Sequence, residues 1–139
     1  MEIIATINDL ENVVTQLLAY ANGRKKFLLY AEMGSGKTTF VNAFALNLKV
    51  TTATSSPTYS LVNEYIYTEN GAPQLMRHLD LYRLLSLQEA KDIGIEDILD
   101  DAHYAFIEWP EVIEPLLYGD EIRINIEIMS DNSRKFVFL

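Results

Sequence analysis

Cysteine is absent from this chain of 139 residues, and no apolar run approaches the ~18 residues of a membrane-spanning helix. Without cysteine the chain has neither a disulfide framework nor a thiolate zinc site. Its first residues include Glu2 and Asp9 and carry no basic flank, so they do not resemble a signal peptide. We therefore expect a cytoplasmic protein with no membrane segment.

Basic residues are also scarce. The chain has 20 acidic and 11 basic residues, which gives a formal net charge of −9. A surface of this sign repels phosphate backbones at long range. We expect no autonomous binding to DNA or RNA, so that if tRNA is involved, a partner should hold it.

The most informative feature that is present is the segment Ala31–Thr38, with the sequence AEMGSGKT. It matches the phosphate-binding pattern G-x-x-x-x-G-K-[ST] everywhere except the first position, where Ala31 replaces glycine. The two later glycines let backbone N–H groups form a nest for phosphate oxygens. Lys37 is expected to reach the β- and γ-phosphates, and the Thr38 hydroxyl to ligate Mg²⁺.

The context of this loop strengthens the prediction. Residues 26–30 are apolar and aromatic, as in a buried parallel strand, and apolar residues recur at helical spacing over 40–48. A helix beginning at the loop would add partial positive charge at the phosphate site. The alternative is a glycine turn before a helix, but the context favours a nucleoside triphosphate site.

The whole pattern predicts one domain, residues 1–139, of the α/β class. We expect a P-loop NTPase-like three-layer fold with a mixed, mainly parallel central sheet and antiparallel additions. Helices are predicted over 10–21, 40–48, 86–93 and 95–99, and strands over 26–30, 59–68, 75–82, 104–107, 122–128 and 134–139.

Two acidic residues near strand ends are candidates for the catalytic chemistry. A phosphate loop needs carboxylates nearby, to hold Mg²⁺ through water and to orient the attacking nucleophile. Glu108 closes the apolar strand 104–107, and Asp80 lies between apolar neighbours near the end of another strand. The alternative for each is a surface acid at a strand end.

Other residues leave two interpretations open or favour a structural role. Trp109 follows Glu108 and either stacks near the site or packs as a half-buried aromatic. The polar segment 55–58 either approaches a γ-phosphate or is an ordinary connection. His78 and His103 have no His, Cys or acidic partner at ligand spacing, so metal binding by imidazole is not expected. Packing is the favoured role of the tyrosines at 59, 65 and 67.

Some classes of nucleotide protein are excluded or weakened. The sequence has neither the Asn-Lys-x-Asp base-reading motif nor the Asp-x-x-Gly switch of GTPases. A small-molecule kinase needs clustered lid arginines, whereas the five arginines of this chain are spread widely. A kinase and a nucleotide-dependent interaction module remain as alternatives to an ATPase.

Four motifs lie in order along the chain, at residues 34–40 (GSGKTTF), 56–65 (SPTYSLVNEY), 78–83 (HLDLYR) and 107–111 (IEWPE). In this order they resemble one family, the bacterial TsaE (YjeE/YdiB-type) ATPases that assist threonylcarbamoyladenosine modification of tRNA. Together they are far more specific than the phosphate loop alone, and the similarity covers nearly the whole chain. Ala31 departs from the usual glycine and Met33 from the usual leucine, and we expect binding to persist.

The resemblance implies an ATPase that is weak alone and acts on the complex of TsaD with TsaB, so that tRNA is contacted only through that complex. ATP, ADP and Mg²⁺ are its implied ligands. Lys37, Asp80 and Glu108 would be catalytic, with Thr38, Glu108 and Asp80 around the metal. Asn8 and Arg134 would flank the adenine, and Thr58 would belong to a switch near the γ-phosphate. The implied nucleotide-binding residues are Asn8, Met33, Gly34, Ser35, Gly36, Lys37, Thr38, Thr39, Thr58, Trp109 and Arg134.

Overall fold

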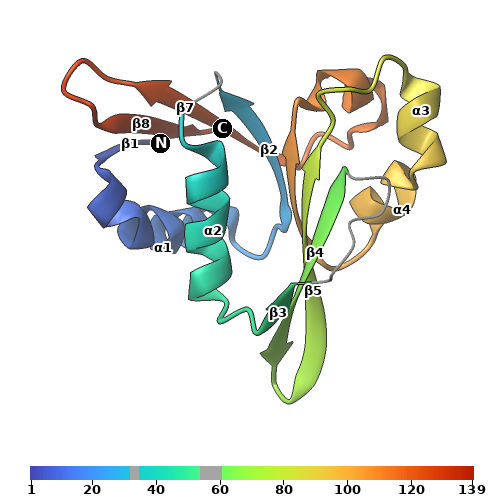
Figure 1. Ribbon diagram of the computed structural model, residues 1–139, viewed down its shortest axis with the longest axis horizontal. Coiled ribbons are helices and arrows are strands. Elements are labelled where there is room, and N and C mark those ends of the chain that lie inside the picture. The colour runs from blue at the N-terminus through green and yellow to red at the C-terminus, as the bar shows by residue number, and fades with distance from the viewer. Residues whose placement is uncertain (32–34, 54–60) are drawn as a thin grey trace.

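The computed structural model describes residues 1–31, 35–53 and 61–139 of the chain. Within these residues a single twisted sheet separates two helical layers (Figure 1). Helices α1 (Leu10–Ala21) and α2 (Lys37–Asn47) cover one face, and α3 (Leu87–Asp92) and α4 (Ile95–Asp100) lie over the other. No helix in the described ranges is long and apolar enough to cross a membrane.

The strands and short 3₁₀ helices complete the description. The strands are β1 (Glu2–Ala5), β2 (Lys26–Ala31), β3 (Thr52–Ala53), β4 (Val62–Glu69), β5 (Ala72–Asp80), β6 (Tyr104–Glu108), β7 (Ile122–Ile128) and β8 (Arg134–Phe138). The 3₁₀ helices are η1 (Ile7–Asp9) and η2 (Pro110–Leu116).

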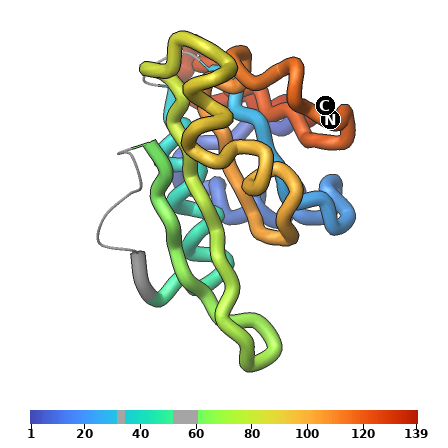
Figure 2. The backbone as a smooth tube through the Cα atoms, turned by 90° about the vertical axis from the view of Figure 1, so that its right-hand side faces the viewer, coloured from blue at the N-terminus to red at the C-terminus, as the bar shows by residue number. Residues whose placement is uncertain are grey.

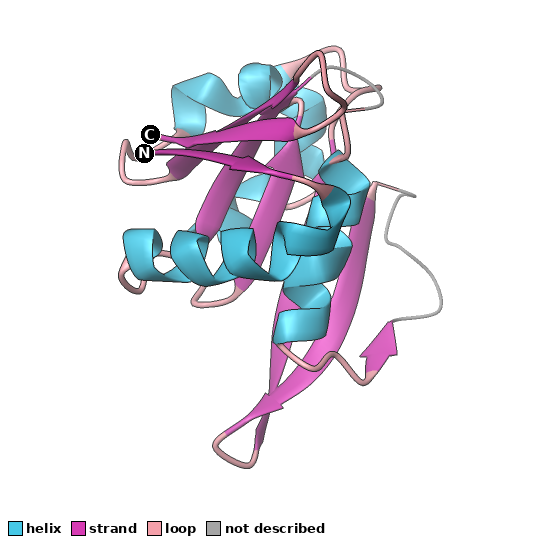
Figure 3. Cartoon of the chain, turned by 90° about the vertical axis from the view of Figure 1, so that its left-hand side faces the viewer, coloured by secondary structure: helices cyan, strands magenta, loops and turns pink. Residues whose placement is uncertain are grey.

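The described strands form one sheet in the order β1-β8-β7-β2-β6-β5-β4-β3. Strands β5, β6, β2 and β7 run parallel at its centre, and the pairs on either side are antiparallel (Figure 3). The phosphate-loop strand β2 therefore lies between two parallel neighbours, buried on both faces. This arrangement confirms the predicted α/β class with a parallel centre and antiparallel additions.

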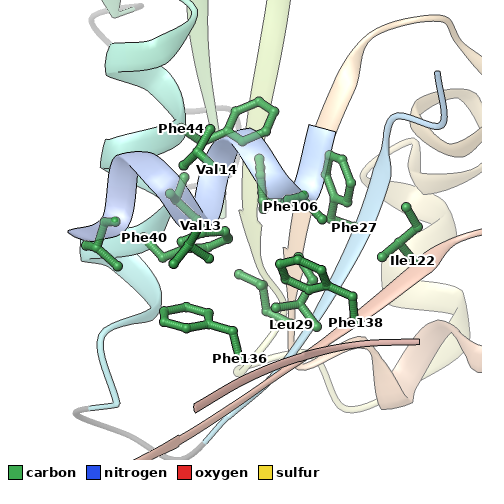
Figure 4. Packing of buried hydrophobic residues seen from close by; sticks show 14 of the residues in the cluster. Val13, Val14, Phe27, Leu29, Phe40, Phe44, Phe106, Ile122, Phe136 and Phe138 are labelled. Carbon is green, nitrogen blue, oxygen red and sulfur yellow. The ribbon is translucent and has the colours of Figure 1, made fainter. Parts of the chain in front are cut away.

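Alternation along the central strands divides the core between the two faces of the sheet. Phe27 and Phe106 point toward α1 and α2, and both are fully buried among aromatic and aliphatic side chains (Figure 4). Their ring centroids lie 4.8 Å apart, a distance typical of a favourable aromatic pair. Leu28 and Ile107, one residue further along each strand, pack on the opposite face beneath α3 and α4. Two-sided burial explains why these strands have continuous apolar sequences.

The local signals in the sequence mostly coincide with the observed element ends. The Ser86 side chain accepts a hydrogen bond from the Glu89 backbone N–H at 3.2 Å and caps α3. Asn70 and Gly71, both with positive φ, form the two-residue turn between β4 and β5. That hairpin extends well beyond the rest of the molecule (Figure 2). Strand β5 begins three residues before its predicted start and ends two residues earlier.

Four elements were not predicted from the sequence: the strands β1 and β3 and the 3₁₀ helices η1 and η2. β1 pairs with β8 at one edge of the sheet, and the two ends of the chain lie side by side there (Figure 3). β3 has only two residues, and η2 contains Pro110 and Pro115. Residues 59 and 60 of the predicted 59–68 strand lie outside the described residues, and β4 begins at Val62.

Candidate functional site

The candidate site lies at the carboxyl ends of the parallel strands. β2 ends at Ala31 and α2 begins at Lys37, while Glu108 and Asp80 are the last residues of the neighbouring strands β6 and β5. Asp80 and Glu108 are register partners, so the two carboxylates leave the sheet at the same level and from the same face. In open α/β sheets this edge is where ligands bind.

Lys37 occupies the centre of the site. Its side chain is buried, and its Nζ atom lies 3.4 Å from Oε1 of Glu108 and 3.3 Å from the carbonyl oxygen of Ala31. The same ammonium lies 5.0 Å from the ring centroid of Trp109, within cation–π range. The buried charge is therefore compensated by a carboxylate, a carbonyl and an aromatic ring.

Glu108 is buried and held at both oxygens. Oε2 lies 2.5 Å from Nε2 of His78, while Oε1 faces Lys37. Burial alone would raise the pKa of Glu108, but the hydrogen bond and charge of His78, followed by the charge of Lys37, lower it below its ordinary value. Glu108 is therefore an ionised carboxylate at neutral pH, available to accept hydrogen bonds.

His78 is the residue that sequence reasoning missed. Its spacing along the chain shows no acidic partner, because its partner Glu108 is 30 residues away. The parallel register of β5 and β6 brings them together. His78 pairs with Phe106, which lies two residues before Glu108 and therefore on the same face of the sheet. A register assignment for these two strands would have revealed the contact.

Asp80 has a different environment from Glu108. Its side chain is exposed, and Oδ1 accepts a hydrogen bond from the Tyr82 backbone N–H at 3.0 Å. The Tyr82 ring in turn lies 5.3 Å from Trp109, centroid to centroid. Asp80 is thus at the rim of the site, while Glu108 lies inside it. Trp109 is half-buried, so it both contacts the site through Lys37 and packs against the hydrophobic cluster.

The start of α2 presents several groups toward the loop. Thr38 and Thr39 are exposed in its first turn. Gly36 has φ of +100°, a conformation that glycine adopts readily and other residues rarely. The buried hydroxyl of Ser35 has no hydrogen-bond partner among the described residues. Across all the residues that the structure describes, no three or more His, Asp or Glu side chains form a cluster suited to a metal.

Arg134 and Asn8 lie on the other side of α2. The Arg134 Nε–H donates to the Ser35 carbonyl oxygen at 2.8 Å and so ties β8 to the loop. Arg134 and Thr39 line a cavity of about 320 Å³, and Asn8 and Thr39 line a second cavity of about 500 Å³. The cavities share Ile7, Leu10 and Thr39. The structure therefore brings Asn8 and Arg134 near one another without placing both in a single cavity.

Three predicted positions lie outside the described residues: Met33, Gly34 and Thr58. The remaining predicted residues divide into two groups. Lys37, Thr38, Asp80, Glu108 and Trp109 lie at the strand ends and the start of α2. Ser35, Gly36 and Thr39 connect that group to the cavities beside Arg134 and Asn8.

Together the sheet order and the Gly36–Lys37 step at which α2 begins define a three-layer α/β protein of the P-loop NTPase type. A crystal structure of Bacillus subtilis YdiB shares this fold, with a TM-score of 0.72 and 22% sequence identity. The superposition covers 99% of this chain and 83% of the other.

Sequence comparisons give the family. The family model "Threonylcarbamoyl adenosine biosynthesis protein TsaE" matches residues 4–136. The tRNA threonylcarbamoyladenosine biosynthesis protein TsaE of Aquifex aeolicus is 36% identical over 135 residues, covering 96% of this chain and 90% of the relative. Its Bacillus subtilis counterpart is 30% identical over 120 residues, covering 86% and 72%. The chain therefore belongs to the TsaE family, as its motifs predicted.

Proposed function

We propose that this protein binds ATP with Mg²⁺ and hydrolyses it as the ATPase subunit of the tRNA threonylcarbamoyladenosine machinery. The observation that carries the proposal is the position of Lys37. Its buried ammonium stands at the first residue of α2, directly after the loop, and faces Glu108 at the end of the neighbouring parallel strand. Membership of the TsaE family supports the biological setting.

The phosphate end of the nucleotide would meet groups that suit an anion. Lys37 supplies the charge, and the first-turn N–H groups of α2 point out of the helix start. The buried Ser35 hydroxyl is an additional donor with no other partner among the described residues. Backbone N–H groups near Gly36 would complete the nest.

The donor set also fits Mg²⁺, which keeps several waters and takes few protein ligands in phosphate sites. Thr38 would ligate the ion through its hydroxyl, and Glu108 and Asp80 would hold it through water. When bound, the ion would supply positive charge against the phosphates and the charge that develops on transfer. Because Glu108 is ionised and buried while Asp80 is exposed, Glu108 is the better placed of the two to orient the attacking water.

We assign the nucleoside end to the two cavities beside α2. Arg134 and Thr39 line the nearer one, next to Ser35 and Gly36, and Asn8 lines the next. The two cavities share the lining residues Ile7, Leu10 and Thr39, so together they lead away from the start of α2. We propose that adenine lies along this path between Arg134 and Asn8, and that Met33 and Gly34 shape its phosphate end.

The partner of the ATPase is proposed to be the TsaB–TsaD complex in the cytoplasm, with tRNA reached only through it. The net charge of −9 opposes direct contact with a tRNA backbone. Thr58 and its neighbours are proposed to sense the γ-phosphate and to report the nucleotide state to that complex.

Titration calorimetry with Mg²⁺-ADP tests the binding site without depending on any partner. Wild-type protein is expected to bind one nucleotide, and Lys37→Ala to bind at least about tenfold more weakly, because a charge-assisted contact is removed. Lys91→Ala, which removes an exposed lysine of α3, is the matched control and should bind as wild type. Equal binding by wild type and Lys37→Ala would refute the site.

A further inference from the structure

One contact in the site has no place in the roles assigned so far: the buried pair of His78 and Glu108. The exposed fractions of these residues are 8% and 6%, and Nε2 of the ring lies 2.5 Å from Oε2 of the carboxylate. His78 lies two residues before Asp80 in β5. It pairs with Phe106, on the face of the sheet that α1 and α2 cover. It therefore approaches Glu108 from within the sheet, from the strand that also ends in Asp80.

The two oxygens of Glu108 have separate partners. His78 occupies Oε2, and Oε1 is directed at Lys37, 3.4 Å away. A glutamate side chain has three rotatable bonds, so a carboxylate held at one oxygen by a sheet residue loses most of that freedom. The rigid sheet, through His78, thus sets where Oε1 points.

Such a pair is not an efficient source of stability. Removing a carboxylate and an imidazole from water costs free energy, and apolar replacements of buried polar pairs are often neutral or stabilising. A fixed hydrogen-bond donor has its main effect on the orientation of its acceptor. This matters because displacing a catalytic group by about 1 Å can lower the rate about 100-fold. The geometry thus favours a role in the reaction over a role in folding.

We propose that His78 is a positioning residue, which fixes the Glu108 carboxylate so that Oε1 faces Lys37 and the phosphate loop. The inference rests on the proposed ATPase function. It assigns no contact between His78 and the nucleotide: His78 acts through Glu108 alone.

The test compares His78→Leu, which removes the donor at similar volume, with His78→Gln, whose amide places a donor at a similar distance from the backbone. ATP turnover is measured with the partner complex present. His78→Leu is expected to lower kcat about 10- to 100-fold while the Kd for Mg²⁺-ADP changes less than about threefold. His78→Gln is expected to recover most of that loss. If the His78→Leu protein does not fold, it is replaced by His78→Asn, whose side chain is too short to reach Oε2.

His103→Leu is the matched control, because His103 is the other histidine of the chain and lies before β6, at the strand end opposite Glu108. It should retain wild-type kcat. The kcat of the double variant His78→Leu/Glu108→Gln should be no lower than that of Glu108→Gln alone, because both substitutions disrupt the same functional pair. Losses that multiply would overturn the proposal, as would wild-type kcat in His78→Leu.

A second readout does not depend on turnover. Trp109 is the single tryptophan of the chain, and its ring contacts the Lys37 ammonium. Release of Glu108 lets Lys37 move, so the emission of His78→Leu should shift in the same direction as that of Glu108→Gln, while His78→Gln keeps wild-type emission. Unchanged emission in His78→Leu would contradict the inference. If wild-type protein binds no nucleotide, the proposed function fails, whatever the His78 variants show.

Discussion

The Nζ atom of Lys37 lies 3.4 Å from Oε1 of Glu108, so the lysine we assign to the phosphates is already paired with the carboxylate we assign to the water. Phosphate oxygens and this carboxylate compete for one ammonium. The residue that promotes hydrolysis is therefore expected to oppose nucleotide binding, and the two effects can be separated by mutation.

Glu108→Gln should show this separation. The amide keeps the shape of the side chain but removes its negative charge, so Mg²⁺-ADP should bind as tightly as to wild type or more tightly. Turnover should fall about 100-fold, because the group that orients the attacking water is lost. Calorimetry and a phosphate-release assay with the partner complex measure the two quantities. Glu111→Gln, at an exposed position of η2, is the control. Wild-type turnover in Glu108→Gln would refute its role.

Thr58→Ala tests the proposed link to the partner. Affinity of the protein for the TsaB–TsaD complex should differ between ATP and ADP, because a γ-phosphate sensor shifts the balance between loop arrangements. Thr58→Ala should shrink that difference, and Thr68→Ala, on the exposed hairpin, should leave it intact. Titrations against the complex and against free tRNA provide the data. Equal affinity in all nucleotide states of the wild type, or tight binding to tRNA alone, would contradict the assignment.

Asp101 should make the free energy of unfolding depend on pH in the acid range. It bridges Lys26, at 2.7 Å, and Arg77, at 2.5 Å. Burial alone would raise the pKa of Asp101, but hydrogen bonds from Lys26, the His103 backbone and Arg77 hold it below its ordinary value. A lowered pKa in the folded state means that this contribution is present above the pH range in which an unfolded aspartate titrates, and is lost as the pH falls through the lower, folded-state pKa.

Asp101→Asn is therefore expected to cost roughly 2 kcal/mol of unfolding free energy at pH 7, and progressively less as the pH falls into the acid range where Asp101 is protonated. Urea unfolding at a series of pH values from 7 downward measures the difference, with the exposed Asp120→Asn as control. A penalty that stays constant over this range would show that the carboxylate charge is not the source of the stabilisation.

Phe106→Ala should be the most damaging of these changes for stability. The ring is fully buried, and its centroid lies 4.8 Å from those of both Phe27 and Phe44 (Figure 4). Truncation leaves a cavity at the centre of the aromatic cluster, with an expected cost of about 3–5 kcal/mol. Leu85→Ala, at a position that is 90% exposed, should change stability by less than about 0.5 kcal/mol in the same urea experiment.

The sequence predicted those parts of the fold whose signals are local. Periodicity located the central strands and helices, Ser86 and Glu89 marked a helix start, and Asn70–Gly71 marked a hairpin. The edge strand β1 was missed because its four residues are too few to establish an alternation, and its partner β8 lies at the far end of the chain. Pairing across that distance is a property of the folded chain and not of any short window.

The same distinction, between local signals and pairing across the chain, explains which site residues could be predicted. Lys37, Glu108 and Asp80 were found because each follows a recognisable strand or loop signal. The contact between His78 and Glu108 was not, because it depends on the parallel register of β5 and β6, which no spacing in the sequence reveals. Nor does spacing distinguish Glu108, buried between a histidine and a lysine, from the exposed Asp80.

ATP turnover with and without the TsaB–TsaD complex and tRNA tests the central claim most directly. Wild-type protein should hydrolyse ATP slowly alone and markedly faster when the complex and tRNA are both present. Lys37→Ala should show no stimulated activity, whereas Lys91→Ala should match wild type. Phosphate release that is absent in every mixture, or that is unaffected by the complex, as for an independent kinase, would contradict the account.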